Sequence, residues 1–240
     1  MPLVTRFAAI DTLFLDAGGV LVHPSWDRVG AALAEAGVAA DPARLAAADP
    51  HARHALDAAM VTGPSDDRRR GWLYFDLVLD HAGIAASEAT SAALATLRAY
   101  HDEHNLWEHV GDGVVPALAA FRARGLRLVV VSNANGRLRH LFDRLDLTRW
   151  FDALIDSHEW GVEKPDPRLF RLALNASGAA AERTVHVGDL YGVDVVGARS
   201  AGLAGAILVD SAGLYAEADC PRVARLAEIV GWLDREGGNG

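Results

Sequence analysis

The sequence TLFLDAGGVL, residues 12–21, decides how this chain folds. An apolar run that ends at an aspartate and two glycines is typical of a buried strand that stops abruptly. Asp16 is therefore expected at the carboxyl end of a strand, where open α/β sheets build their sites. Gly18 and Gly19 would let backbone amides approach a bound anion. Asp16 would be a metal ligand, a nucleophile or both; the alternative is an aspartate that only caps the following turn.

Beyond about residue 110 the sequence alternates between helical and strand patterns. Predicted strands lie at residues 126–131, 153–155, 184–187 and 206–209, and predicted helices at 115–124, 138–147 and 167–177. With residues 13–15 this makes five strands. Such alternation predicts an α/β fold, a doubly wound, Rossmann-like parallel sheet with helices on both faces.

Between residues 22 and 109 the strand signal disappears, and the spacing predicts an inserted domain of several short helices. Trp72, Phe75 and Leu79 fall on one face of a helix that would start after residues 63–66 and stop at Gly83. The run at residues 68–70, three arginines, is interpreted as a solvated face; the alternative is an anion-binding group. The core would comprise residues 1–22 and 109–240, and the helical domain residues 23–108.

The composition limits the classes of partner. A net charge of -9 argues against nucleic-acid or membrane-surface binding. No stretch approaches the roughly 18 apolar residues of a membrane span, and Asp11 and Asp16 stand where a signal peptide would be apolar. The single cysteine, Cys220, excludes an internal disulfide and fits a reducing compartment. A cytoplasmic protein is therefore expected.

Polar and charged residues follow the predicted strand ends, and these ends converge in a doubly wound sheet. They are Asp16, Ser132, Asn133, Lys164, Asp189 and Asp194. Three carboxylates at one place repel by about 4 kcal/mol per pair at 4 Å and an effective dielectric near 20. A cation would resolve this, and oxygen-only ligands suit Mg²⁺. Lys164, the only lysine among 23 Lys+Arg, would add a compact positive charge.

The order of these residues resembles the haloacid dehalogenase-like (HAD) hydrolase superfamily, in subfamily I, whose helical C1 cap lies between the first two motifs. The first family motif is D-x-D-G-T/V-L, and this chain has DAGGVL at residues 16–21. The second is a strand ending in Ser or Thr, here Ser132 with Asn133. The third is K-P, here at Lys164, and the fourth is G-D-x₄-D, here residues 188–194. The match covers nearly the whole chain outside the helical insertion.

The resemblance implies a set of roles. Asp16 would be the nucleophile that forms a covalent aspartyl intermediate. Mg²⁺ would be held by Asp16, the Gly18 carbonyl and Asp189. Asp194 would either be a further ligand or contact the ligands from behind. Ser132 and Lys164 would bind the transferring phosphoryl group together with the segments around Gly18, Gly19 and Asn133, and Lys164 would also orient Asp16.

The chain departs from the phosphatases of this family at Gly18, where they carry a second aspartate that serves as general acid and base. Its loss typically costs about 10²–10⁴-fold in rate. The expectation is a Mg²⁺-dependent phosphatase of a small phosphorylated metabolite whose leaving group is undemanding or is protonated by another residue, such as His23, His51 or His54. The subunit would be a monomer or a homodimer.

Glycine at position 18 also raises three other hypotheses about function. A 2-haloacid dehalogenase expels halide and needs neither proton nor metal, but the acidic pair Asp189 and Asp194 disfavours it. Phosphonatase chemistry would need a cap lysine, which this chain lacks. A catalytically weak binding protein of HAD fold is the remaining alternative.

Overall fold

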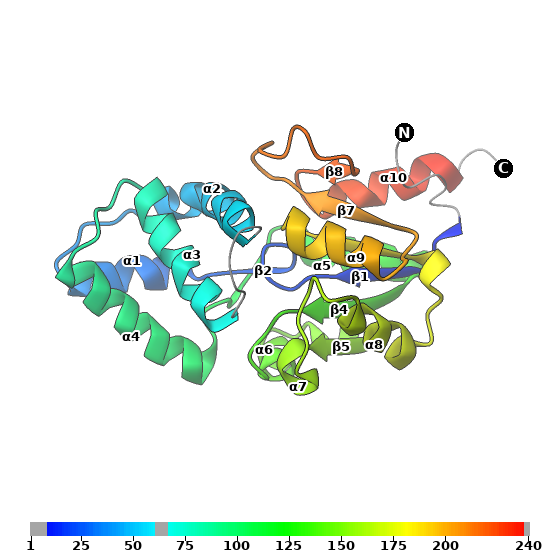
Figure 1. Ribbon diagram of the computed structural model, residues 1–240, viewed down its shortest axis with the longest axis horizontal. Helices are drawn as coiled ribbons and strands as arrows, with labels where there is room; N and C mark the ends of the chain where they lie inside the picture. The colour runs from blue at the N-terminus through cyan, green and yellow to red at the C-terminus, as the bar shows by residue number, and fades with distance from the viewer. Residues whose placement is uncertain (1–8, 61–66, 238–240) are drawn as a thin grey trace. The chain divides into compact units, whose positions relative to one another are not determined.

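The computed structural model describes residues 9–60 and 67–237, and it divides into two compact units (Figure 1). One unit comprises Met1–Val22 and Val110–Gly240, and the other His23–His109. The chain passes between them through β2 (Val22–His23) and β3 (His109–Val110), which pair in a two-stranded sheet.

The first unit, the core unit, is built on a six-stranded sheet with the order β5-β4-β1-β6-β7-β8 among the described residues. The strands are β1 (Thr12–Leu15), β4 (Arg127–Ser132), β5 (Ala153–Asp156), β6 (Thr184–Gly188), β7 (Gly205–Val209) and β8 (Arg222–Val223). All neighbouring pairs are parallel. The five predicted strands are confirmed. The edge strand β8 was not predicted, because two residues with an exposed arginine carry no readable pattern.

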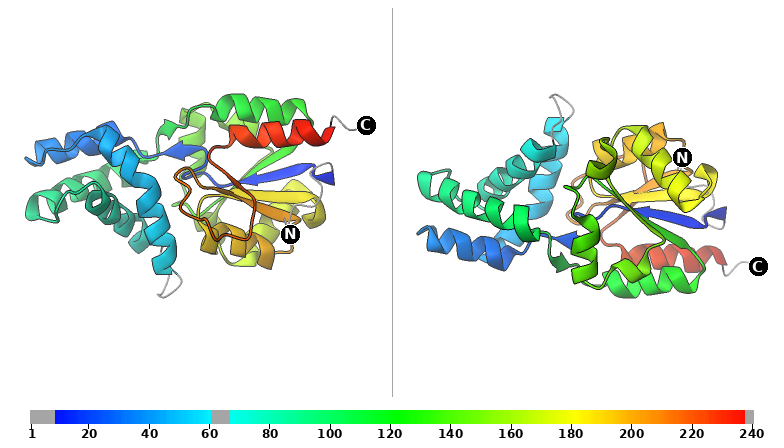
Figure 2. Two further views of the ribbon diagram at one scale, coloured as in Figure 1. Left: turned by 90° about the horizontal axis from the view of Figure 1, so that it is seen from above. Right: turned by 90° about the horizontal axis from the view of Figure 1, so that it is seen from below.

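Helices cover both faces of this sheet (Figure 2). One face carries α5 (Val114–Ala123) and α10 (Ala227–Gly237), and the other carries α8 (Pro167–Ser177) and α9 (Val196–Ser200). Because alternate side chains of a strand point to opposite faces, Phe14, Val129 and Leu208 pack with Leu169 and Phe170 of α8 in one cluster. Every residue of β1 is buried, as expected for a central parallel strand. The doubly wound α/β prediction is confirmed.

The sheet order fixes where a site can form. From β1 the chain continues to β4 and β5 on one side and to β6, β7 and β8 on the other. Ligands of open α/β sheets bind beyond the carboxyl ends of the strands at such a reversal. Asp16, after β1, and Asp189, after β6, follow the two strands that meet there.

Shorter helices connect the remaining strands. They are α6 (Leu138–Arg144), which is shorter than the predicted 138–147, and α7 (Ser157–Trp160). Asp166 caps α8 by accepting a hydrogen bond from the amide of Arg168, and a proline occupies the first turn. The helix therefore begins directly after the Lys164 segment.

The second unit, the helical unit, contains α1 (Trp26–Glu35), α2 (Pro42–Met60), α3 (Asp67–His81) and α4 (Glu88–His104) among its described residues. Phe75 and Leu79 are buried in its core, and Trp72 packs against them, so the predicted apolar face is confirmed. At 19 residues α2 is longer than the short helices expected. The predicted helix start at residues 63–66, and the side chains of residues 68–70, lie outside the described residues.

Within residues 9–60 and 67–237, no helix combines the length and the apolar character that crossing a membrane requires. Cys220 is half-buried, and burial raises the pKa of its thiol. This agrees with an inert thiol and not with a nucleophile.

Candidate active site

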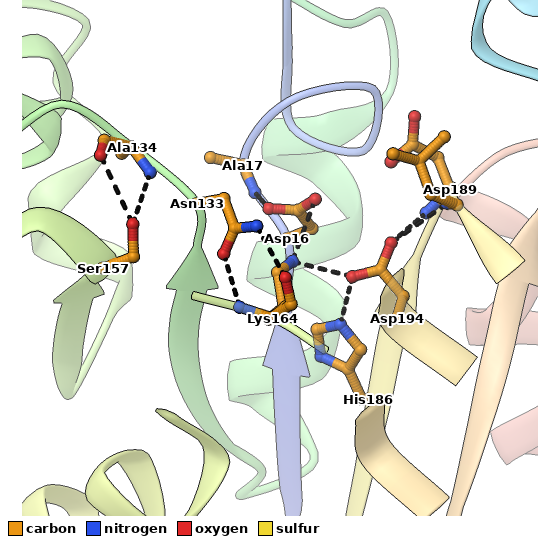
Figure 3. A network of polar contacts seen from close by, with 10 residues as sticks. Asp16, Ala17, Asn133, Ala134, Ser157, Lys164, His186, Asp189 and Asp194 are labelled. Carbon is orange, nitrogen blue, oxygen red and sulfur yellow. Dashed lines mark hydrogen bonds and ion pairs between the residues drawn. The ribbon is translucent and has the colours of Figure 1, made fainter. Parts of the chain in front are cut away.

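Segments far apart in the sequence meet at the carboxyl edge of the core sheet (Figure 3). Asp16 follows β1, Ser132 ends β4, and Asp189 follows β6. Lys164 reaches the same place from the segment between α7 and α8. Parallel strands bring their carboxyl ends to one edge, which explains why residues so distant in sequence converge.

The turn after Asp16 is held by its own backbone. The amides of Leu21 and Val22 both donate to the carbonyl of Ala17, and the amide of Gly19 donates to the carbonyl of Val22 at 2.9 Å. Gly19 has a φ of 76°, a left-handed conformation that favours glycine, whereas Gly18 does not. The amide of Ala17 donates to Oδ1 of Asp16 at 2.7 Å, which fixes the carboxylate at the strand end.

Lys164 lies between two carboxylates. Its Nζ is 2.7 Å from Oδ1 of Asp194 and 3.1 Å from Oδ2 of Asp16, and its side chain is 1% exposed. Burial alone would lower the pKa of Lys164, but the two carboxylates outweigh it and leave the pKa above its usual value. Lys164 is therefore a charged ammonium at neutral pH.

Asn133 clamps the backbone of Lys164. Its Nδ2 donates to the carbonyl of Lys164 at 3.0 Å, and its Oδ1 accepts from the amide of Lys164 at 2.7 Å. The segment after Asn133 is braced in turn by Ser157, whose hydroxyl donates to the carbonyl of Ala134 and accepts from its amide. In this structure the Asn133 side chain positions Lys164, and the Ser132 side chain, also buried, lies at the end of the strand beside it.

Asp194 accepts four hydrogen bonds. Its Oδ1 accepts from Lys164 and from Nε2 of His186 at 2.8 Å, and its Oδ2 accepts from the amides of Asp189 at 3.1 Å and Leu190 at 3.0 Å. Asp194 is held there by a turn of π-helix, η4 (Tyr191–Val195). A Cβ at Gly188 would overlap the side chain of Asp194, so only glycine fits at that position.

The pKa values of the two carboxyls move in opposite directions. Burial alone would raise the pKa of Asp194, but Lys164 and His186 outweigh it and hold the pKa well below its usual range. For Asp16, burial raises the pKa, and the charge of Lys164 only partly opposes it, while the charge of Asp194 adds to it. Asp194 is thus the better compensated of the two carboxyls, and Asp16 is the less compensated one.

Sequence reasoning missed His186. It lies on β6, two residues before Gly188, and is completely buried. A histidine within an otherwise apolar strand next to an acidic motif was the available signal. The strand predicted at residues 184–187 contains this histidine, but a strand pattern assigns no role to a single polar position within it.

The acidic residues offer one site for a cation. Ligand oxygens of Asp16, Asp189 and Asp194 lie within 4.8 Å of one another, the one such group found in the described part of the chain. Three carboxylates face a single lysine ammonium, which leaves an excess of negative charge, and an all-oxygen donor set suits Mg²⁺. The residues present therefore fit a divalent cation, although both oxygens of Asp194 already accept hydrogen bonds.

The three histidines considered as proton donors belong to the helical unit or its edge. Nδ1 of His23 is 3.8 Å from a carboxylate oxygen of Asp49, and the rings of His51 and His81 lie 5.7 Å apart. His54 is half-buried on α2. Their role in proton transfer stays a prediction.

A family model described as haloacid dehalogenase-like hydrolase matches residues 10–202 of this chain. The chain therefore belongs to the haloacid dehalogenase-like hydrolases, and the resemblance inferred from its motifs is confirmed.

Individual relatives extend this comparison. The chain is 36% identical over 137 residues to haloacid dehalogenase-like hydrolase domain-containing protein 3 of Homo sapiens, covering 56% of this chain and 54% of that protein. It is 33% identical over 131 residues to the glyceraldehyde 3-phosphate phosphatase of Methanopyrus kandleri, covering 54% and 55%. The chain thus spans about half the length of the curated relatives it matches.

A solved structure matches more of the chain. The putative HAD-hydrolase YfnB of Bacillus subtilis, bound to magnesium, superposes with a TM-score of 0.66 at 17% identity, covering 94% of this chain and 99% of that one. At this identity the likeness shows the fold alone.

Proposed function

We propose that the protein is a Mg²⁺-dependent phosphatase of a small phosphorylated metabolite, with Asp16 as the nucleophile. The observation that carries the proposal is the buried ammonium of Lys164 between the carboxylates of Asp16 and Asp194. A charged group this deeply buried is costly unless it is paired, and here one of its partners stands at the carboxyl end of the central strand. The similarity to a phosphatase of Methanopyrus kandleri supports this class of substrate.

The proposed reaction has two displacements at phosphorus. A carboxylate oxygen of Asp16 attacks the phosphorus, and the bond to the leaving oxygen breaks, so that this oxygen departs with the bonding electron pair and takes a proton from water. Water then attacks the phosphorus of the aspartyl phosphate. The bond between phosphorus and Asp16 breaks, which releases phosphate and restores the carboxylate. Lys164 and the Ser132 hydroxyl bind phosphoryl oxygens during both steps.

The cation would be held by Asp16, Asp189 and the carbonyl of Gly18, with Asp194 next to them. When bound, Mg²⁺ would offset the negative charge of the phosphoryl group and of Asp16. Both carboxylate oxygens of Asp194 already accept hydrogen bonds, four in all, which supports placing Asp194 beside the cation and not among its direct ligands.

The helical region, residues 23–108, would act as a cap that selects the substrate, and the protein would work in the cytoplasm. The position of the insertion between Asp16 and Ser132 supports the first proposal, and the single cysteine supports the second.

The test is phosphate release from a panel of phosphate esters with Mg²⁺ and after its removal by a chelator. The proposal expects turnover that chelation abolishes and added Mg²⁺ restores. It also expects rates that fall steeply as the leaving group becomes a poorer one, because residue 18 is glycine and supplies no acid. Turnover that is unaffected by chelation would overturn the proposal.

Gly18→Asp sharpens this test. The backbone at Gly18 is not left-handed, so a residue with a side chain introduces no backbone strain there. The variant is expected to raise kcat/KM for alkyl phosphates about 10²-fold, the lower end of what a general acid contributes. Acyl phosphates, whose leaving groups need no proton, are the control and should change little. An equal effect on both substrate types would contradict the role assigned to this position.

A 2-haloacid dehalogenase is the second candidate, favoured by one observation, the missing acid at Gly18. There a carboxylate oxygen of Asp16 would attack the carbon and displace halide to form an ester. Water would then attack the ester carbonyl, and the bond from that carbonyl carbon to the substrate oxygen would break, which releases the hydroxy acid and a proton and restores the carboxylate. A single turnover in ¹⁸O-water separates the two. The phosphatase puts the label in phosphate, whereas the dehalogenase leaves it in the carboxylate of Asp16, as mass spectrometry of the peptide would show.

A further inference from the structure

His186 is the one fully buried histidine among the ten of the chain, all of which the structure describes. Its ring points from β6 toward Asp194, as Figure 3 shows, with Nε2 2.8 Å from Oδ1. Because a carboxylate can only accept, Nε2 must carry the proton and donate it. The ring edge packs against Phe170 with centroids 5.0 Å apart.

The other ring nitrogen, Nδ1, shows that packing alone does not explain a histidine at position 186. Nδ1 is buried and has no hydrogen-bond partner among the described residues. A buried polar atom without a hydrogen bond is unfavourable. A leucine would fill the same apolar space beside Phe170 and would leave no such atom. Packing alone therefore does not explain a histidine, and the hydrogen bond from Nε2 is what the residue adds.

The hydrogen bond from His186 to Asp194 affects how the ammonium of Lys164 is shared between Asp194 and Asp16. Nζ is closer to Asp194, at 2.7 Å, than to Asp16, at 3.1 Å. His186 donates to the same oxygen of Asp194 that Lys164 contacts. Without this second donor Asp194 would be less compensated, and it would draw the ammonium away from Asp16. The carboxylate would also lose one of the two groups that fix Oδ1.

We propose that His186 is a positioning residue, which holds the Asp194 carboxylate so that the ammonium of Lys164 stays shared with Asp16. Its effect on the reaction rests on the proposed phosphatase function, but its effect on Lys164 does not. The test therefore needs one readout of turnover and one of the lysine itself.

The variants are matched in size. His186→Gln keeps a donor at the distance of Nε2, and His186→Leu removes it at similar volume. Where His186→Leu fails to fold, His186→Asn replaces it, because its amide ends short of Asp194. Val185→Ala is the control for a packing defect, since Val185 is buried on the same strand but points to the other face of the sheet.

The decisive readout uses the fact that Lys164 is the only lysine. Labelling with ¹⁵N-lysine gives one side-chain ammonium resonance, observed without metal or substrate. Wild type, His186→Gln and Val185→Ala are expected to show a slowly exchanging signal. In His186→Leu or His186→Asn the signal should shift and its proton exchange should become at least about 10-fold faster, the change in the opening equilibrium that corresponds to the loss of one hydrogen bond to a charged group.

Turnover of phosphate esters should follow the same order. His186→Leu is expected to lower kcat by about 10- to 100-fold with little change in KM, and His186→Gln to restore most of it. An ammonium resonance that is unchanged in His186→Leu or His186→Asn would overturn the proposal. If wild type releases no phosphate from any ester, the phosphatase proposal fails, and the resonance still decides the role of His186.

Discussion

Two clusters of charged side chains, one in each unit, both pair aspartate with a basic residue and a histidine, but they differ in their balance of charge. The core cluster contains Asp16, Lys164, His186, Asp189 and Asp194. The helical cluster contains His23, Asp49, Arg53 and Tyr74. The first sets three carboxylates against one ammonium, and the second sets one carboxylate against one guanidinium.

The helical cluster satisfies itself. Asp49 is 7% exposed and accepts hydrogen bonds from Arg53 and from the hydroxyl of Tyr74. Burial alone would raise the pKa of Asp49, but Arg53, His23 and Tyr74 outweigh it and lower the pKa from 3.8 to about 2. The carboxylate of Asp49 thus has its counterion, Arg53, within the cluster, and the pair leaves no excess of negative charge.

In the core cluster the carboxylates outnumber their counterions. Asp194 is satisfied, but the pKa of Asp16 stays raised by burial because one lysine serves two carboxylates. Perturbed carboxyls with excess charge at the edge of a sheet are typical of functional sites. We infer that the balance of charge, and not burial alone, marks the core cluster as the candidate reactive site and the helical cluster as a structural one. Three substitutions test this difference.

The largest effect is expected from Asp16→Asn. An amide cannot act as the nucleophile, so phosphate release should fall by at least about 10⁴-fold, on the scale of removing other catalytic nucleophiles. Binding of the phosphorylated substrate, measured by calorimetry, should persist. Unchanged turnover would exclude Asp16 as nucleophile, and absent turnover in wild type together with retained binding would favour a binding protein.

Lys164→Arg is expected to come next. The planar guanidinium does not fit a site where one ammonium meets two carboxylates at 2.7 and 3.1 Å, so kcat/KM should fall by about 10²–10³-fold. The reciprocal change, Arg53→Lys, is the matched control in the helical cluster. It should alter the free energy of unfolding more than it alters kcat/KM, and the reverse result would assign the helical cluster a role in catalysis.

Asp49→Asn should produce the smallest of the three effects, and it should appear in stability. Since the folded pKa of Asp49 is about 2 and lies below the usual 3.8, its charge stabilises the fold above pH 3.8, and this contribution is lost as the pH falls toward 2. The pH-dependent part amounts to about 2 kcal/mol. Urea unfolding of the wild type and the variant between pH 7 and pH 3 should show a difference that shrinks only below about pH 4. A difference independent of pH would contradict the lowered pKa.

The fold could be predicted further than the site. Apolar runs that stop at Asp16, Ser132 and Gly188 mark β1, β4 and β6. Parallel strands leave their carboxyl ends at one edge, so the convergence of these ends followed from topology. The two-residue strand β8 is too short to carry a pattern. The clamp between Asn133 and Lys164 joins residues 31 positions apart through side-chain geometry, which no spacing rule specifies. His186 was missed because a polar residue in a core strand is visible only through its partner.

The most direct test of the central claim is to trap the covalent intermediate. Wild-type protein turning over a phosphate ester with Mg²⁺ would be quenched and treated with borohydride, which reduces an acyl phosphate to an alcohol. The peptide containing residues 12–21 would then be sequenced by mass spectrometry, with Asp16→Asn as the control. We expect homoserine at position 16 in the wild type alone. Rapid turnover with an unmodified Asp16, or a reduced aspartate at another position, would contradict the account.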